Sequence, residues 1–324
     1  MSKKEENRSR KGWKRYLPIV IALCFVAGGA LLVVKKKSTD TAQQSSVQTL
    51  PELGMFDRNK RCAVPPKFLR EKGVSQPVLI DLSQKKYTGV ALLYGRNFSQ
   101  VYHPVQWERF GHLGTYAADD QGNLFLVPMP FISIRPTTFA LQKNIYKIDT
   151  TTGKLSIFMR LDDVYPSANN PYGINSIVYD CDDKTLWVSA IDESDYTHQK
   201  GVIYHIDPQD RSVIGKIEGV DALSLALIHT DTGKYLLVGS ARENALYRYR
   251  LSSTSEAQGP FVVLQIPAAE ERIRKIRIVG KSTLELQTIP FSYALIARSV
   301  DKDRRIYRAA WDSFSKTWKI GEKR

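Results

Sequence analysis

The 324-residue sequence predicts an all-β domain that follows a single transmembrane α-helix. Three observations support this fold class. Residues 17–34 carry no charge, runs of alternating apolar and polar residues recur from about residue 76 onward, and no long amphipathic helical pattern follows them. Alternation with period two, bounded by Asp, Gly, Asn and Lys turns, indicates β-strands. A stretch of roughly 250 residues is ample for one large β-domain.

The first predicted element is a transmembrane helix at Leu17–Val34, with the sequence LPIVIALCFVAGGALLVV. A helix of this length rises about 27 Å, close to the ~30 Å hydrocarbon core of a bilayer. A cleaved signal peptide is the alternative. Its apolar run would be about 7–15 residues long and would end at a small-residue cleavage site, whereas Lys35–Lys37 follow directly here. The sequence therefore favours an uncleaved membrane anchor.

The flanking charges predict how this helix is oriented. Seven Lys/Arg residues precede it and three follow it, with Trp13 and Tyr16 at the position of interfacial aromatics. Positive residues favour the cytoplasmic side. We therefore expect a basic cytoplasmic tail over residues 1–16, a single pass through the bilayer, and a periplasmic or extracellular location for the remaining chain.

The formal net charge of +14 first suggests a nucleic-acid partner. Residues 1–37 contain ten Lys/Arg and two Glu, a net charge of +8, so +6 remains for residues 38–324. Each basic residue beside anionic headgroups contributes about 1 kcal/mol to membrane binding. The charge distribution therefore indicates a lipid bilayer as the partner of the tail, and it removes nucleic acid as a leading idea.

Residues 35–74 are expected to form a linker and an irregular segment leading into the domain. The run STDTAQQSSVQT at 38–49 has nothing to bury, and Pro65-Pro66 interrupts any regular element. Cys62 and Cys181 would share an oxidising compartment in the predicted orientation. They could form a disulfide or remain two buried thiols, and the sequence does not decide between these possibilities.

A repeated hairpin organises residues 75–324. One form is an alternating strand, a polar turn and a second alternating strand, found at 78–93, 145–161, 203–219, 246–266 and 306–321. A different hairpin precedes most copies, at 115–127, 175–189, 224–239 and 275–289. Two hairpins make a four-stranded antiparallel unit, which is the blade of a β-propeller. We count four complete units and one partial unit, which predicts five or six blades, and we expect the first strands to close onto the last blade.

One blade resembles a known superfamily. The runs NPYGINSIVYD at 170–180, KTLWVS at 184–189 and IYHID at 203–207 resemble NHL-repeat blades and the gluconolactonase and strictosidine-synthase group of calcium-dependent propellers. In the lactonase group, a Pro-Asn-Gly turn delivers an Asn to a central divalent ion. The matching triplet here is Pro171-Tyr172-Gly173, so this chain departs from the pattern at the ligand position.

In a propeller, the segments that enter the inner strands and the loops that follow the second strands converge on a central pocket. Those segments supply the candidate ligand-binding residues His112, Asn170, Tyr172, Asn175, Asp192, Asp221, Arg242 and Arg274. Hard cations prefer several oxygen ligands, and a calcium ion would use Asn175, Asp192 and Asp221. Asn and Asp side chains more often cap turns, so no metal or other cofactor is favoured.

Two functions follow from these observations. In the first, the chain is a membrane-anchored binding or scaffold propeller for a protein, peptide or glycan outside the cytoplasm, without enzymatic activity. In the second, it is a calcium-dependent, lactonase-like hydrolase or lyase that uses the central pocket. The sequence contains no GxSxG, phosphate-binding glycine loop or HExxH motif. The first function is therefore favoured.

Overall fold

The computed structural model describes residues 56–57, 62–74, 77–130, 139–230, 232–252, 257–294 and 304–322. The chain divides into two compact units, Met1–Gln48 and Thr49–Arg324, and the described residues belong to the second. The predicted tail and the predicted transmembrane helix at Leu17–Val34 therefore lie outside the described residues. Within the described ranges, no helix is long and apolar enough to cross a membrane.

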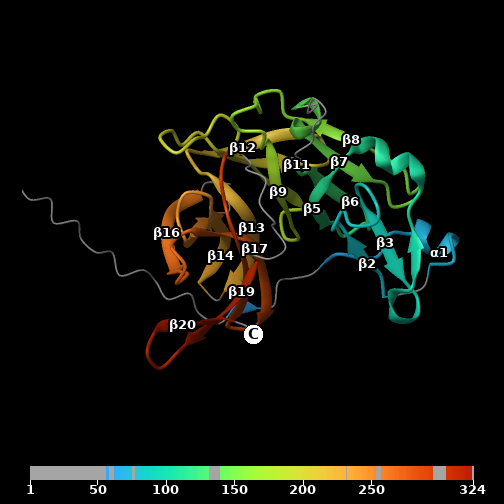
Figure 1. Cartoon of the computed structure of the whole chain (residues 1–324). Helices are drawn as coiled ribbons and strands as arrows, with labels where there is room; N and C mark the ends of the chain where they lie inside the picture. The colour runs from blue at the N-terminus through green and yellow to red at the C-terminus, as the bar shows by residue number, and fades with distance from the viewer. Residues whose placement is uncertain are drawn as a thin grey trace, which may run out of the picture. The chain divides into compact units, whose positions relative to one another are not determined.

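The described strands form five antiparallel sheets, the blades of a β-propeller (Figure 1). Blade 1 contains β2 (Leu79–Asp81), β3 (Ala91–Tyr94) and β4 (Gln100–Tyr102). Blade 2 contains β5 (Leu113–Ala118), β6 (Leu124–Pro128), β7 (Asn144–Ile148) and β8 (Leu155–Arg160). Blade 3 contains β9 (Ile174–Asp180), β10 (Thr185–Ala190), β11 (Val202–Asp207) and β12 (Ser212–Glu218).

Blade 4 contains β13 (Ala222–Thr230), β14 (Gly233–Ser240), β15 (Ala245–Leu251) and β16 (Ala257–Gln265). Blade 5 contains β17 (Glu271–Gly280), β18 (Thr283–Pro290), β19 (Arg305–Asp312) and β20 (Thr317–Glu322). The short strand β1 (Phe56–Asp57) pairs with β13, and the other short elements are helix α1 (Phe68–Glu71) and the 3₁₀ turns Arg96–Phe98, Val105–Phe110 and Phe139–Lys143. The predicted all-β propeller is thus confirmed with five blades.

The tight turns inside the blades depend on the residues that predicted them. Between β5 and β6, Asp119 Oδ1 accepts the backbone N–H groups of Gln121 and Asn123 at 3.0 and 2.7 Å. Gly122 has φ +89°, and a Cβ there would lie 2.8 Å from Thr150 Oγ1. Glycine is required because it tolerates both this backbone conformation and the close approach.

Buried apolar clusters join neighbouring blades. Phe125 and Leu186 lie in the cluster between blades 2 and 3, and Leu237 and Leu286 lie in the one between blades 4 and 5. Two further clusters join blade 1 to blade 2 and blade 3 to blade 4. In the described part of the chain, no buried cluster joins blade 5 to blade 1. The hydrophobic core is therefore a row of four interfaces, and a fifth, smaller cluster around Leu223 and Tyr293 packs at one end of the inner strands.

Two details of the predicted topology are wrong. Residues 78–93 were expected to form the second hairpin of a blade, but β2 and β3 are the first two strands of blade 1, and β4 follows as the third. Alternation alone does not distinguish an inner hairpin from an outer one, because the side chains of both alternate between the two faces of a sheet. Residues 78–80 border the central cavity, which identifies β2 as the inner strand.

The expected closure of the first strands onto the last blade is also not observed. Blade 5 consists of four consecutive strands, β17 to β20, whereas the N-terminal strand β1 pairs with β13 at the inner edge of blade 4. Phe56 is paired with Thr230 and Asp57 with His229. Among the described residues, blade 5 contains no strand from the N-terminal part of the chain.

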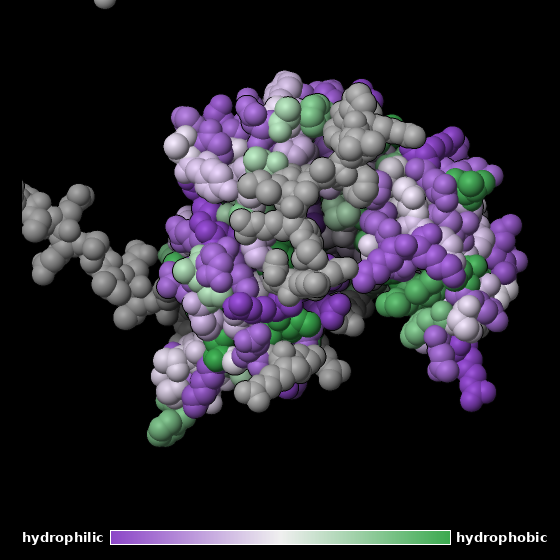
Figure 2. Space-filling view, viewed as in Figure 1, coloured by the Kyte–Doolittle hydropathy of each residue, from purple (hydrophilic) through white to green (hydrophobic). Residues whose placement is uncertain are grey.

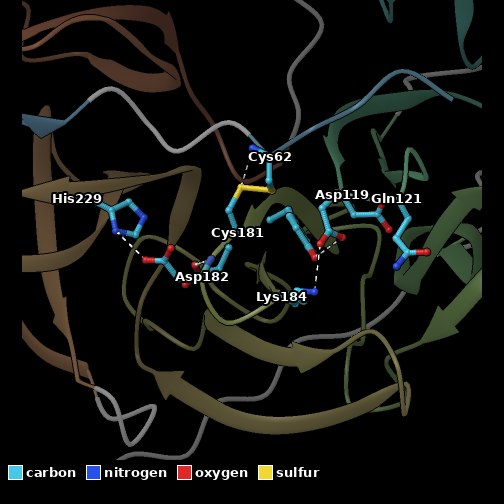
Figure 3. The surroundings of a disulfide bond; sticks show 10 residues. Cys62, Asp119, Gln121, Cys181, Asp182, Lys184 and His229 are labelled. Atoms are coloured by element: carbon cyan, nitrogen blue, oxygen red, sulfur yellow. Dashed lines mark hydrogen bonds and ion pairs between the residues drawn. A yellow bond between two sulfur atoms is a disulfide. The ribbon is translucent and has the colours of Figure 1, made fainter.

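The segment before blade 1 forms a strap, residues 62–68, across the end of the channel. A disulfide joins Cys62 to Cys181 in the β9–β10 turn, with their Cα atoms 5.7 Å apart (Figure 3). This resolves the pairing that the sequence left open. The strap then reaches blade 2, where Phe68 N–H donates to Thr150 O at 2.8 Å. Closing a loop of this length stabilises a fold by about 4–5 kcal/mol in the chain-entropy account.

Candidate functional site

The inner strands β5, β9, β13 and β17 begin at one end of the channel, which we call the strand-start face, and they end at the strand-end face. Asp221 lies directly before β13, on the strand-start face, and its side chain is fully buried. Its Oδ1 accepts from Ser194 Oγ at 2.6 Å and from Gly201 N–H at 2.9 Å. Its Oδ2 accepts from Tyr293 OH at 2.6 Å and from Arg242 Nη1 at 3.3 Å.

Arg242 holds the loop between β10 and β11 in place. Its Nη1 donates to the backbone carbonyls of Asp195 at 2.8 Å and His198 at 3.2 Å, and its Nη2 donates to that of Tyr196 at 2.9 Å. The guanidinium therefore joins a loop of blade 3 to the Asp221 carboxylate of blade 4. Because a guanidinium has a rigid fork of donors, this arrangement fixes the backbone that carries Tyr196.

Four aromatic side chains form a row on this face. The ring centroids of Tyr172 and Phe291 are 5.3 Å apart, those of Phe291 and Tyr293 5.1 Å, and those of Tyr293 and Tyr196 5.4 Å. We call these residues the aromatic row. Burial raises the pKa of Tyr172 to about 12, and Tyr293 is also buried, but Tyr196 at the end of the row is 68 % exposed. Tyr172 and Phe291 are half-buried, so the row runs along this face and ends at an exposed ring.

Arg274 lies at the β17 bulge and borders the central cavity. Its Nη1 donates to Leu223 O at 3.3 Å, and its Nη2 lies 3.5 Å from where a Cβ on Gly114 would stand. The side chain therefore joins blade 5 to blades 4 and 2. Desolvation lowers its pKa, and the nearby Tyr172 acts in the opposite direction.

The predicted calcium ligands have separate structural partners. Asp192 Oδ2 accepts from Tyr165 N–H at 2.6 Å, and burial raises the pKa of Asp192 to about 6. Asn175 Nδ2 donates to Ala222 O at 2.8 Å, while its Oδ1 is buried without a hydrogen-bond partner among the described residues. The oxygens of Asp221 accept four hydrogen bonds.

Two other predicted site residues also serve the local fold. Asn170 Nδ2 donates to Ile191 O and Ser194 O at 2.6 and 2.8 Å. His112 lies directly before β5, where its backbone carbonyl accepts from Met129 N–H at 2.9 Å, and burial lowers its pKa.

The structure thus brings Asp221 together with Arg242, and Tyr172 together with Arg274. Sequence reasoning missed Tyr293, Phe291, Ser194 and Tyr196. A signal for the first two was present, because Phe291-Ser292-Tyr293 follows the second strand of blade 5, as Asp192 and Arg242 follow the second strands of blades 3 and 4.

A different acidic group lies at the strand-end face. Asp180, Asp182 and His229 have ligand atoms within 4.8 Å of one another, beside the disulfide (Figure 3). Lys234 Nζ lies 2.6 Å from Asp180 Oδ2 and also contacts Asp183, and His229 Nδ1 lies 3.2 Å from Asp182 Oδ2. The lysine ammonium already neutralises the buried carboxylate, so this group is an ion-pair network of the fold.

A cavity of about 760 Å³ runs between the two faces and is bordered by the inner strands of all five blades. Polar side chains join adjacent inner strands around it. Ser176 Oγ accepts from Leu225 N–H at 3.1 Å, and Ser224 Oγ donates to Ile273 O at 2.8 Å. The cavity has room for a small molecule.

No known family model and no curated protein matches the chain. Among solved structures, a putative gluconolactonase is 14% identical over 81% of this chain and 97% of its own, with a TM-score of 0.42. The dihydro-heme d1 dehydrogenase NirN is 11% identical, with a TM-score of 0.37, over 78% of this chain and 47% of its own. The chain thus spans about half the length of NirN. Pyrococcus horikoshii acylaminoacyl peptidase is 12% identical over 71% of this chain and 35% of its own, with a TM-score of 0.35. Likeness at this level gives no information about activity.

Proposed function

We propose that this chain is a single-pass, membrane-anchored propeller that binds a protein, peptide or glycan outside the cytoplasm through its strand-start face. The observation that carries the proposal is the aromatic row, which ends at the exposed Tyr196 on a loop fixed by Arg242. Aromatic rings supply contact area at little entropic cost, and a fixed loop reduces the ordering cost of binding. Asp221 accepts hydrogen bonds at both oxygens, which favours recognition over acid–base chemistry.

The disulfide supports the proposed location. A bond between Cys62 and Cys181 persists in oxidising compartments and is rare in the cytosol of mesophiles. Together with the apolar run Leu17–Val34 and its flanking charges, it favours a cytoplasmic N-terminus, an anchor in the lipid bilayer, and a periplasmic or extracellular propeller. No nucleic-acid partner and no cofactor are included in the proposal.

The test is binding by the full-length protein in detergent micelles to arrays of peptides and glycans. Array members that bind should lose about tenfold or more in affinity with Tyr196→Ala, because this ring is the solvent-exposed end of the row. Phe314→Ala is the matched control, since Phe314 is an aromatic side chain, 97 % exposed, on the β19–β20 hairpin. Binding that survives Tyr196→Ala but is lost with Phe314→Ala would contradict the proposal.

The alternative is a calcium-dependent, lactonase-like hydrolase or lyase. The buried, unpartnered Oδ1 of Asn175 favours it, since this oxygen could ligate a cation. The guanidinium of Arg242, 3.3 Å from Asp221 Oδ2, opposes a cation at that carboxylate. Bound Ca²⁺ in protein purified without chelator, lost on Asn175→Ala, would decide for the alternative.

A further inference from the structure

Blade 1 has one face without a neighbouring blade in the described part of the chain. Its strands place Ile80, Leu92 and Tyr102 side by side on the face that packs against blade 2. The opposite face carries the register row Leu79, Leu93 and Val101. Leu79 is 48 % exposed, and the other two are half-buried. We call this row the aliphatic wall.

Blade 5 has a second such face. Ile276 and Ile278 of β17 pack toward blade 4, so the residues that alternate with them, Lys275, Arg277 and Val279, point the other way. The row continues across the sheet, because Arg277 is paired with Glu285 and Glu285 with Arg308. Lys275, Arg277 and Arg308 are exposed. We call Lys275, Arg277 and Arg308 the basic wall.

Both walls open on the same space. The central cavity is bordered by Leu79 and Ile80 on one side and by Lys275, Arg277 and Val279 on the other. In Figure 2, hydrophobic surface gathers around and below the region of β2 and β3, whereas hydrophilic and hydrophobic surface lie next to one another near β19. The space between blades 1 and 5 is therefore lined by aliphatic side chains on one side and by cations on the other.

These walls are poorly suited to pack on each other. Closing the ring would bury the ammonium of Lys275 and the guanidinium of Arg277 against leucine, which costs several kcal/mol per unpaired ion. Two carboxylates of the described residues lie on this face, and both are paired: Glu285 Oε1 is 3.3 Å from Arg277 Nη1, and Asp312 contacts Lys319. Although Lys275 is exposed, desolvation beside its neighbours lowers its pKa, and the positive charges of Arg277, Arg274 and Arg304 lower it further. The cations of this region therefore repel one another and attract an anion.

We propose that the space between the aliphatic wall and the basic wall binds an extended peptide of a partner protein in which acidic and aliphatic residues alternate. Side chains of a β-strand point alternately to opposite faces, so such a peptide presents carboxylates to Lys275 and Arg277 and aliphatic groups to Leu79 and Leu93. The channel edge of an inner strand accepts such pairing, because β1 occupies the same edge of β13. This surface differs from the aromatic row, so the inference goes beyond the proposed function.

The experiment measures fluorescence anisotropy of labelled peptides with the full-length protein in detergent micelles. The probe has about eight residues of alternating Glu and Val, the length of an ordinary strand. The comparison peptides are alternating Lys and Val, and a block peptide with all Glu before all Val. We expect the alternating acidic probe to bind at least tenfold more tightly than either, and its binding to weaken as salt rises.

Three variants test the assignment of the walls. Lys275→Glu/Arg277→Glu should weaken probe binding about tenfold or more, and Leu79→Ser should weaken it while leaving the salt dependence intact. The charge-matched control Lys72→Glu/Lys154→Glu, at two exposed lysines distant from β17, should bind normally. Tyr196→Ala should also bind normally, which separates this surface from the aromatic row.

Several results would overturn the inference. Equal binding of the alternating and block peptides would show that the net charge of the peptide determines binding and that the alternation of its side chains does not. Tighter binding of inorganic polyphosphate or of vesicles with anionic lipid, reduced by the same β17 variants, would assign the basic wall to a phosphate-bearing partner. Self-association that the β17 variants abolish would assign the space to a second copy of this chain.

Discussion

At the residue scale, the polar side chains that sequence analysis singled out mostly serve the fold. Asp221 and Arg242 were predicted to converge, and they do, but they bind each other and a neighbouring loop. Residue type and position in the repeat were enough to place them on one face. Their partner Tyr293 could not be predicted, because it comes from a link between β18 and β19 whose path depends on packing and has no repeat of its own.

We expect the carboxyl of Asp192 to make the stability of the folded protein depend on pH. Burial raises the pKa of its carboxyl to about 6, above the value of about 3.9 in an unfolded chain. The unfolded state therefore loses its proton first, and this group lowers the stability of the folded protein as pH rises from about 4 to 6. A shift of this size corresponds to roughly 3 kcal/mol at most. Asp192→Asn should raise the thermal midpoint of the full-length protein at pH 7.5 and leave it nearly unchanged at pH 4.

The measurement is unfolding followed by tryptophan fluorescence at both pH values. Asn keeps an oxygen that can accept the Tyr165 N–H group, so the hydrogen bond is preserved. A stabilisation that is equal at pH 4 and 7.5 would refute titration of Asp192 as its cause.

At the scale of elements, the β-rich runs and the turns between them predicted the hairpins of blades 2 to 5 well, because each strand packs against at least one neighbouring blade. The frame of the first hairpin was wrong, since β2 has only three residues and the local pattern does not specify which sheet edge it occupies. The pairing of Cys62 with Cys181 also could not be predicted, because proximity across 119 positions is set by how blades 1 to 3 pack together.

We expect the disulfide between Cys62 and Cys181 to stabilise the folded protein. Cys62→Ser/Cys181→Ser should lower stability by about 2–5 kcal/mol, because the unfolded chain regains the freedom of a long loop. The expected result is a lower thermal midpoint than in the parent protein. A reducing agent should lower the midpoint of the parent protein similarly and leave that of the double variant unchanged. Cys24→Ser, in the predicted membrane segment, is the control and should have no effect. A double variant as stable as the parent protein would refute a stabilising role for the strap.

At the scale of the whole molecule, the blades form a row of four packed interfaces whose two ends are blade 1 and blade 5. Composition and repeats predicted the propeller, but not this open position. The signal was present in the sequence KIRIVG at 275–280, where charged residues alternate with the apolar ones. The pattern alone could not predict an open position, because the sequence does not show which blade would lie next to the charged face of β17.

Amide hydrogen exchange should distinguish the blades in the middle of this row from the blades at its two ends. Strands with buried neighbours on both faces open only with global unfolding, whereas end elements open locally. We therefore expect β9, β10, β13 and β14 to exchange most slowly, and β2 to β4 and β20 to exchange faster by at least tenfold. Mass spectrometry of pepsin fragments from the full-length protein measures both. Equal protection of blade 1 and blade 3 would contradict the row of interfaces.

The disulfide also decides how tension travels through the molecule. Residues 62–181 form a covalent loop that contains blades 1 and 2. Once β1 has separated from β13, a pull on the chain ahead of Cys62 therefore passes through the two sulfur atoms to the β9–β10 turn, and most of it bypasses β2 to β8. Blade 1, which among the described residues has a neighbouring blade on one face only, is thus protected from force applied to the chain ahead of Cys62. The blade that receives that force is held between buried clusters on both sides.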